Sequence, residues 1–383
     1  MMNAHPKSTH GSCLRRLAPA LLASALALLA LAAQGAQAAE FETGSVDLKR
    51  TIDSGPGNSA WETVNLQASY SGPPVIVAGP VTHANEQSLS VRIRNVTATD
   101  FEIELTSPCD SANEDPNKGG LDCPPTNNGD QPQWATETVR WMAVPPGQWT
   151  FPDGTKVEAA RTSVSSVRSA SGSSSAGTGI GFQHTYSGRP VVLHTVNTTN
   201  DDAWIASSVF GPGNNTGSTP SSAAFTLALE GAEVTTSHDP EEIGWVAIEP
   251  GSGNNNGERY HAGVSDGLDT DRHADGCFAQ GTFSGYGSVP DVVAAHNTMD
   301  GTNGAWTRYC GNEIETNQIN LHMDEDQVSD GERGGLPEAT SWFAFGADGI
   351  GLLVEPPSTP LVEYRMDESA WSGADSVLDA TGN

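Results

Sequence analysis

An eight-residue stretch occurs three times, as Tyr70-Ser-Gly-Pro-Pro74-Val-Ile-Val77, Tyr186-Ser-Gly-Arg-Pro190-Val-Val-Leu193 and Tyr286-Gly-Ser-Val-Pro290-Asp-Val-Val293. Each copy is followed by the pattern Glu-x-x-x-Trp-x-Ala, whose acid and aromatic residues are Glu137 and Trp141, Glu241 and Trp245, and Glu338 and Trp342. The numbering gives Tyr-to-Trp separations of 71, 59 and 56 residues. Three landmarks in one order, three times, indicate an internal repeat. Since a unit of about 100 residues can bury its own core, we expect tandem domains and not a solenoid.

A short alternating segment lies between the landmarks of each copy. The three segments are Phe101-Glu-Ile-Glu-Leu105, Phe225-Thr-Leu-Ala-Leu229 and Gln318-Ile-Asn-Leu-His322. Period-two alternation places the apolar residues on one face of a sheet, and a proline at the first position of a strand disturbs no ladder hydrogen bond. Clusters of Gly, Asn, Ser, Thr and Pro interrupt the chain throughout. The sequence therefore predicts an all-β protein of tandem antiparallel β-sandwiches.

The repeated aromatic and acidic residues are interpreted as structural. Trp141, Trp245 and Trp342 begin short apolar runs and are expected in the cores of the sandwiches. Each repeated glutamate precedes its tryptophan by four residues, which places both on the same face of a strand. We expect each glutamate to cap a backbone donor at the end of a sandwich, and not to act as a general acid or base.

Charge excludes two classes of partner. The 383-residue chain carries 47 acidic and 18 basic residues, a net charge of −29. Binding nucleic acid needs a basic surface, and so does docking on anionic lipid. We therefore expect neither a nucleic-acid partner nor attachment to an anionic membrane surface.

Residues 1–38 have the three parts of a secretory signal peptide. Arg15 and Arg16 precede an apolar run from Leu17 to Ala33, which ends in the small-residue site Ala36-Gln37-Ala38. A membrane anchor is the competing interpretation, but the run is barely long enough to span a bilayer. Cleavage removes three basic residues, so the exported chain has a net charge of 15 − 47 = −32. The protein is expected at the cell surface, outside the cell or in the periplasm, with no membrane insertion of the mature chain.

Four cysteines remain after cleavage, and an even count in an exported chain indicates disulfides. We expect Cys109 to pair with Cys123 across a polar insertion, and Cys277 to pair with Cys310. A zinc site is the alternative, but the sequence has neither Cys-x-x-Cys nor clustered histidines.

The first repeat resembles the H-type lectin domain. The resemblance runs from Gly44-Ser-Val46 through the Tyr70 stretch and Leu89-Ser-Val-Arg-Ile-Arg-Asn-Val-Thr-Ala-Thr-Asp-Phe101 to Glu137-Thr-Val-Arg-Trp-Met-Ala-Val144. It implies a six-stranded antiparallel β-sandwich that binds N-acetylgalactosamine-type sugars and assembles as a trimer. The position of the family's sugar-binding arginine holds Ser88, and its Trp-His positions fall near Pro108 and Cys109. The resemblance therefore supports the expected fold more strongly than it supports the expected sugar ligand.

Two further segments resemble parts of large bacterial surface proteins linked to mannose-sensitive haemagglutinin pilus clusters. One is Val144-Pro-Pro-Gly-Gln-Trp-Thr-Phe-Pro-Asp-Gly-Thr-Lys-Val-Glu158, and the other, Val362 to Asn383, is similar to the opening strands of a laminin-G/concanavalin-like domain. The expected organisation is a signal peptide at 1–38, H-type-lectin-like repeats at 39–162, 163–265 and 266–353, a linker at 354–360 and a truncated laminin-G-like domain at 361–383.

Sugar-binding candidates lie in the loop that follows the proline strand. Sugars are held by amide and carboxylate hydrogen bonds and by an aromatic face, and this loop offers both residue types in the second and third repeats. The candidates are Asn197, Asn200, Asp202, Trp204, Asn297, Asp300, Asn303 and Trp306. The alternative is a polar turn whose tryptophan folds back onto the core.

The sequence favours neither a metal site nor an enzyme. Calcium is conceivable at Asp269-Thr-Asp271-Arg-His-Ala-Asp275 and around Asp324, Asp326, Asp330 and Glu332, but neither run has EF-hand spacing. Gly263-Val-Ser-Asp-Gly267 matches the nucleophile-elbow string without the strand and helix that this motif requires. No catalytic residue and no cofactor is therefore assigned.

The sequence thus indicates a non-enzymatic exported protein for glycan recognition or adhesion. Its expected partners are glycans or glycosylated surfaces, together with surface or pilus assembly partners. The alternative is a structural spacer in a larger surface or pilus-associated protein. The three repeats would either pack about a pseudo-threefold axis, imitating the family's trimer, or form a linear stalk.

Overall fold

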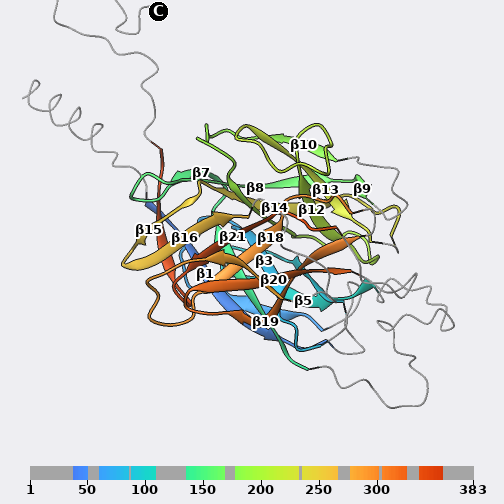
Figure 1. Ribbon diagram of the computed structural model, residues 1–383, viewed down its shortest axis with the longest axis horizontal. Helices are drawn as coiled ribbons and strands as arrows, with labels where there is room; N and C mark the ends of the chain where they lie inside the picture. The colour runs from blue at the N-terminus through green and yellow to red at the C-terminus, as the bar shows by residue number, and fades with distance from the viewer. Residues whose placement is uncertain are drawn as a thin grey trace, which may run out of the picture. The chain divides into compact units, whose positions relative to one another are not determined.

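The described part of the chain consists of mostly antiparallel β-strands joined by turns (Figure 1). The computed structural model describes residues 38–50, 60–85, 88–108, 135–168, 177–232, 235–265, 277–301, 304–325 and 336–356. Within these ranges no helix is long and apolar enough to cross a membrane. The all-β class is confirmed. Residues 1–37 of the expected signal peptide and the whole laminin-G-like segment lie outside the described residues, whereas Ala38, the last residue of that expected peptide, begins the first strand.

The first strand set has an inner sheet segment ordered β1-β6-β3, which is part of an 11-stranded sheet, and a separate three-stranded outer sheet ordered β2-β5-β4. Its strands are β1 (Ala38–Leu48), β2 (Glu62–Asn65), β3 (Val75–Val81), β4 (Ser90–Arg94), β5 (Asp100–Thr106) and β6 (Glu137–Val144).

The second and third strand sets have corresponding pairings. In the second set, β8-β14-β11 and β10-β13-β12 are neighbours, and in the third set β16-β21-β18 and β17-β20-β19. The second set comprises β8 (Lys156–Val164), β9 (Val167–Arg168), β10 (Thr178–Gly181), β11 (Val191–Val196), β12 (Ala206–Phe210), β13 (Ala224–Glu230) and β14 (Glu241–Ile248). The third comprises β16 (Glu258–Val264), β17 (Phe278–Thr282), β18 (Asp291–His296), β19 (Ala305–Ile314), β20 (Gln318–Glu325) and β21 (Thr340–Phe345).

Three further strands join one set to the next. β7 (Gly147–Thr150) pairs with β8, and β15 (Gly251–Asn255) pairs with β16. β22 (Ile350–Val354) instead returns to the start of the chain and pairs with β1, with Ala38 opposite Val354. The last strand therefore closes the described body against its first strand.

The strand pairings differ from the repeat boundaries expected from the sequence. β8 begins at Lys156 and pairs with β14, which places residues 156–162 with the second set. β16 pairs with β21, so residues 258–264 belong with the third set. β22 includes Val354, the first residue of the expected linker. The repeated landmarks do not mark where the second and third sets begin, because the first strand of each of these sets precedes them.

Each set has its own hydrophobic cluster built around one repeated tryptophan. Trp141, Trp245 and Trp342 are buried in three separate clusters, as predicted. A Cβ on Gly44 would lie 2.5 Å from the Trp141 ring, and one on Gly263 would lie 2.2 Å from the Trp342 ring. These two glycines on the opposing strands leave room for the indoles.

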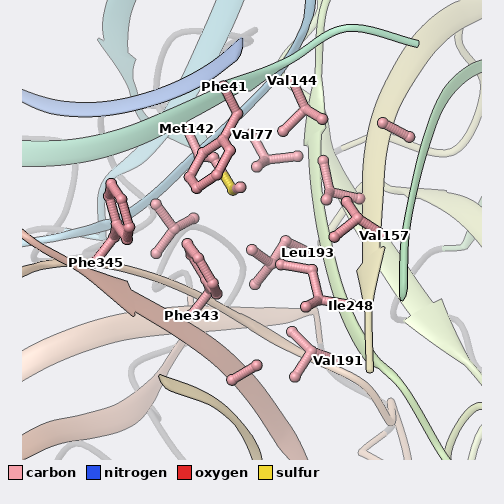
Figure 2. Packing of buried hydrophobic residues seen from close by; sticks show 14 of the residues in the cluster. Phe41, Val77, Met142, Val144, Val157, Val191, Leu193, Ile248, Phe343 and Phe345 are labelled. Carbon is pink, nitrogen blue, oxygen red and sulfur yellow. The ribbon is translucent and has the colours of Figure 1, made fainter. Parts of the chain in front are cut away.

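A fourth cluster is shared by all three sets. Along the inner strands, side chains point alternately to the separate cluster of their own set and to this common core. The residues of the common core include Val77 and Met142 of the first set, Leu193 and Ile248 of the second, and Phe343 and Phe345 of the third (Figure 2). Both faces of each inner sheet are thus covered by apolar side chains. This explains the uninterrupted apolar run of β3, because a strand buried on both faces loses its polar alternation.

One of the two expected disulfides lies within the described residues. Cys277 and Cys310 are bonded, as predicted. Cys109 and Cys123 lie outside the described residues.

The side chain of Asn255 on β15 hydrogen-bonds to the backbone of β22, the strand that pairs with β1. This side chain, 1% exposed, donates to the Leu352 carbonyl at 2.9 Å and accepts from the Leu352 amide at 2.7 Å. We expect Asn255→Ala to cost about 1–3 kcal/mol, because it leaves two backbone groups without partners. Hydrogen exchange of β22 should accelerate far more than that of β5, whereas Asn254→Ala, at the exposed neighbouring position, should leave both unchanged. Equal exchange of β22 in the two variants would contradict this role.

Candidate functional site

The predicted sugar-binding residues of the second set serve mostly as internal contacts. Asn197 is buried and bonds both backbone groups of Ile76, at 3.3 Å from the amide nitrogen and 2.9 Å to the carbonyl oxygen. Trp204 is fully buried and its indole N–H donates to Ser90 at 3.1 Å. Asn200 donates to the Pro240 carbonyl at 2.7 Å, and the neighbouring Asp202 is exposed.

The corresponding residues of the third set are arranged similarly. Asn297 is fully buried and donates to the Val192 carbonyl at 2.8 Å, while Trp306 donates from its indole N–H to the Leu89 carbonyl at 2.8 Å. Asp300 is exposed. Asn303 lies outside the described residues.

The structure brings the two candidate tryptophans together. The ring centroids of Trp204 and Trp306 are 5.0 Å apart, and both rings belong to one buried cluster. Each hydrogen-bonds to the start of β4 or the residue before it, so all three strand sets meet here. Neither ring offers a free face to a sugar in this arrangement, whereas Asn200, Asp202 and Asp300 remain at the surface.

The repeated glutamates cap the loops after β3, β11 and β18. Glu137 accepts from the amides of Ala84 at 3.0 Å and Asn85 at 2.8 Å. Glu241 accepts from the Asn200 amide at 2.8 Å, and Glu338 accepts from the Gly301 amide at 3.0 Å.

Each of these carboxylates also accepts from the threonine at the start of its loop, namely Thr82, Thr198 or Thr298. The expected capping role is confirmed. Burial raises the pKa of Glu338 to about 7.

Three buried arginines link the sets in a cyclic order. Arg92 of the first set reaches the loop of the second, bonding the Ala203 carbonyl at 3.0 Å and Glu241 at 2.7 Å. Arg308 of the third set bonds the Thr82 carbonyl of the first at 2.6 Å and pairs with Asp324 at 2.9 Å.

Arg168 of the second set completes the cycle. It bonds the Met299 carbonyl of the third set at 3.2 Å and pairs with Glu230 at 2.9 Å. Sequence reasoning missed these arginines. Two of them, Arg92 and Arg308, lie inside strands of a chain with few basic residues, which was the available signal.

A cavity of about 60 Å³ lies where the three sets meet. Its lining comes from β3, β4, β11, β12, β18 and β19 or residues next to them, and includes Ser90, His194, Ser207, His296 and Trp306. This volume is room for roughly four water molecules and is well below the about 300 Å³ at which small-molecule pockets begin. The cavity is therefore too small for a sugar ring.

Both histidines at the cavity are buried and uncharged at neutral pH. Burial lowers the pKa of His194 to about 4, and burial with the nearby His194 and Arg168 lowers the pKa of His296 well below its usual range. A neutral imidazole with fixed hydrogen bonds acts here as a packing group.

The described residues hold no cluster of three or more side chains suited to a metal ion. Of the acidic runs proposed for calcium, only Asp324 and Glu325 are described, and Asp324 pairs with Arg308. Ser265 of the nucleophile-elbow string exchanges hydrogen bonds with Thr340.

No family model, no curated protein and no solved structure matches the chain.

Proposed function

We propose that the chain is an exported, non-enzymatic recognition protein whose three H-type-lectin-like sandwiches form one head that binds glycans. The correspondence of strand order, tryptophan and glutamate among the three sets supports the assignment of three repeats. The shared core and the cyclic arginine contacts support a compact pseudo-threefold arrangement over a linear string.

The pairing of β1 with β22 is the observation that favours a recognition head over a spacer. Ala38 and Val354 lie opposite each other in neighbouring strands, which are about 4.8 Å apart in a sheet. A body whose two ends lie side by side adds almost no length between the segments that flank it. A spacer would gain nothing from these 300 residues, whereas a head needs only one attachment point.

The net negative charge of the protein disfavours acidic glycans as ligands. The exported chain has a net charge of −32, from 15 basic and 47 acidic residues. Several of its arginines are taken up within the fold, in ion pairs or on carbonyl groups: Arg92, Arg94, Arg161, Arg168, Arg189 and Arg308. Like charges repel over about 10 Å at 0.1 M salt. The ligand is therefore a neutral glycan, with N-acetylgalactosamine-type sugars the first to test.

A glycan array of the whole exported protein tests this proposal. We expect binding to neutral glycans and weaker binding to their sialylated or sulfated forms, with the difference shrinking at 0.5 M salt. Asp202→Ala and Asp300→Ala remove exposed carboxylates from the candidate loops and should each weaken binding about tenfold, the worth of one charge-assisted hydrogen bond. Glu62→Ala, an exposed acid on β2, is the matched control.

No binding to any glycan would favour the spacer role in a larger surface or pilus-associated assembly. Binding that survives both loop variants would place the sugar site elsewhere on the head.

A further inference from the structure

Two histidines from different strand sets meet at the three-way junction. His194 on β11 donates from Nε2 to the His296 carbonyl on β18 at 3.0 Å, so its Nδ1 accepts from Ser207 at 2.8 Å. His296 Nε2 lies 3.3 Å from the Ser208 hydroxyl of β12. The two ring centroids are 5.1 Å apart, with the rings nearly perpendicular. The pair thus forms part of the contact between the second and third sets.

The surroundings of the pair offer little to stabilise positive charge. His194 is 7% exposed and His296 is 2% exposed, and both line the junction cavity. Three of the surrounding strands, β3, β12 and β21, carry no titratable side chain.

Three arginines on the other surrounding strands are paired with carboxylates. Arg168 on β9, which disfavours charge on His296, is paired with Glu230 on β13. Arg92 on β4 is paired with Glu241 on β14, and Arg308 on β19 with Asp324 on β20. Of the remaining acids, Asp291 on β18 faces Arg140, and the pKa of Glu313 on β19 is raised by burial.

We propose that His194 and His296 form an acid-sensitive joint, at which proton uptake by the two rings separates the second strand set from the third. A second positive charge 5.1 Å from the first, on two rings buried between the strand sets, is unfavourable in the closed form. In the open form both imidazolium rings are solvated. Opening also exposes the junction cavity and the Trp306 ring that lines it.

The direction of the pH effect follows from the difference between the two forms. The pKa of His194 is about 4 in the closed form, against 6.5 for a solvated histidine. Between pH 6.5 and 4 the open form binds a proton that the closed form does not, so the closed form loses stability as the pH falls through this window. At pH 5 the factor is (1 + 10^1.5)/(1 + 10^−1), or about 30-fold in the opening equilibrium from His194 alone.

Hydrogen exchange of the whole exported protein at pH 7.5 and pH 5.0 tests the proposal, after correction for the intrinsic pH dependence of exchange. We expect the amides of β11 and β18 to lose about 30-fold or more of their protection at pH 5.0, and those of β5, in the outer sheet of the first set, to lose much less. In the double variant His194→Gln/His296→Gln, this difference between the strands should disappear.

In each protein, the loss of protection in β11 and β18 is compared with the loss in β5. An overall loss of stability in the double variant therefore does not affect the comparison. His184→Gln, which removes a histidine away from the junction, should behave as the unmodified protein does. Equal loss of protection in β5, β11 and β18, or an unchanged pH effect in the double variant, would overturn the proposal. If the double variant does not fold, the single variants His194→Gln and His296→Gln must each reduce the pH effect.

Discussion

Replacing Trp245 by alanine is expected to lower the free energy of unfolding by about 3–5 kcal/mol, the usual cost of deleting a buried aromatic side chain. The indole is 3% exposed and packs edge-to-face on Phe225, with ring centroids 5.3 Å apart. Its N–H also donates to Thr162 at 3.0 Å. Urea unfolding of the variant measures the loss, and Trp141→Ala and Trp342→Ala should give losses of similar size.

Trp149→Ala is the matched control for this series. Trp149 is only partly buried, on the edge of the shared core, and should cost less than any of the three repeated tryptophans. If Trp245→Ala left stability unchanged while abolishing glycan binding, the tryptophan would belong to a binding site and not to the core.

The second large effect is expected at the ion pair between Arg92 and Glu241. Both side chains are fully buried, with a separation of 2.7 Å. Glu241→Gln keeps the shape of the side chain but leaves a buried guanidinium facing a neutral amide. Breaking a buried pair in this way costs about 3–5 kcal/mol. Because Arg92 belongs to the first set and Glu241 to the second, this ion pair also links the two sets.

Glu338→Gln is the control, because Glu338 occupies the corresponding position in the third set. The pKa of this carboxyl is raised by burial from 4.5 to about 7. Its contribution to stability is therefore fully present below pH 4.5 and is lost as the pH rises through 7. The shift of about 2.5 pKa units corresponds to roughly 3 kcal/mol. We expect Glu338→Gln to gain stability relative to the unmodified protein between pH 5 and pH 8, whereas Glu241→Gln should be less stable at both. Similar losses for the two variants at pH 8 would contradict the distinction.

In the candidate sugar site, residue type alone did not distinguish side chains that could contact a ligand from side chains that make internal contacts. Trp204 and Asn197 have the residue types that bind sugars, and those same types also join one buried element to another. An amide that bonds both backbone groups of Ile76 makes the same kinds of hydrogen bonds that it would make to a hydroxyl of a ligand. Exposure distinguishes the two roles, and exposure depends on which strand set lies opposite. The residues that the sequence selected in these loops therefore divide into buried internal contacts, such as Asn197 and Trp204, and exposed side chains, such as Asp202.

Patterns along the chain predicted the all-β class, the three tryptophan cores, the capping glutamates and the Cys277–Cys310 disulfide. These features depend on period-two alternation and on partners within one strand set, which the order of residues along the chain records. The shared core, the cyclic arginine contacts and the return of β22 to β1 became visible in the three-dimensional structure alone. The physical reason is that the apolar run Val75–Val77 requires cover on both faces but does not specify what supplies it. Val191, Phe343 and Leu353 fill that position from far along the chain, and non-directional apolar contacts leave no pairing signal in the sequence.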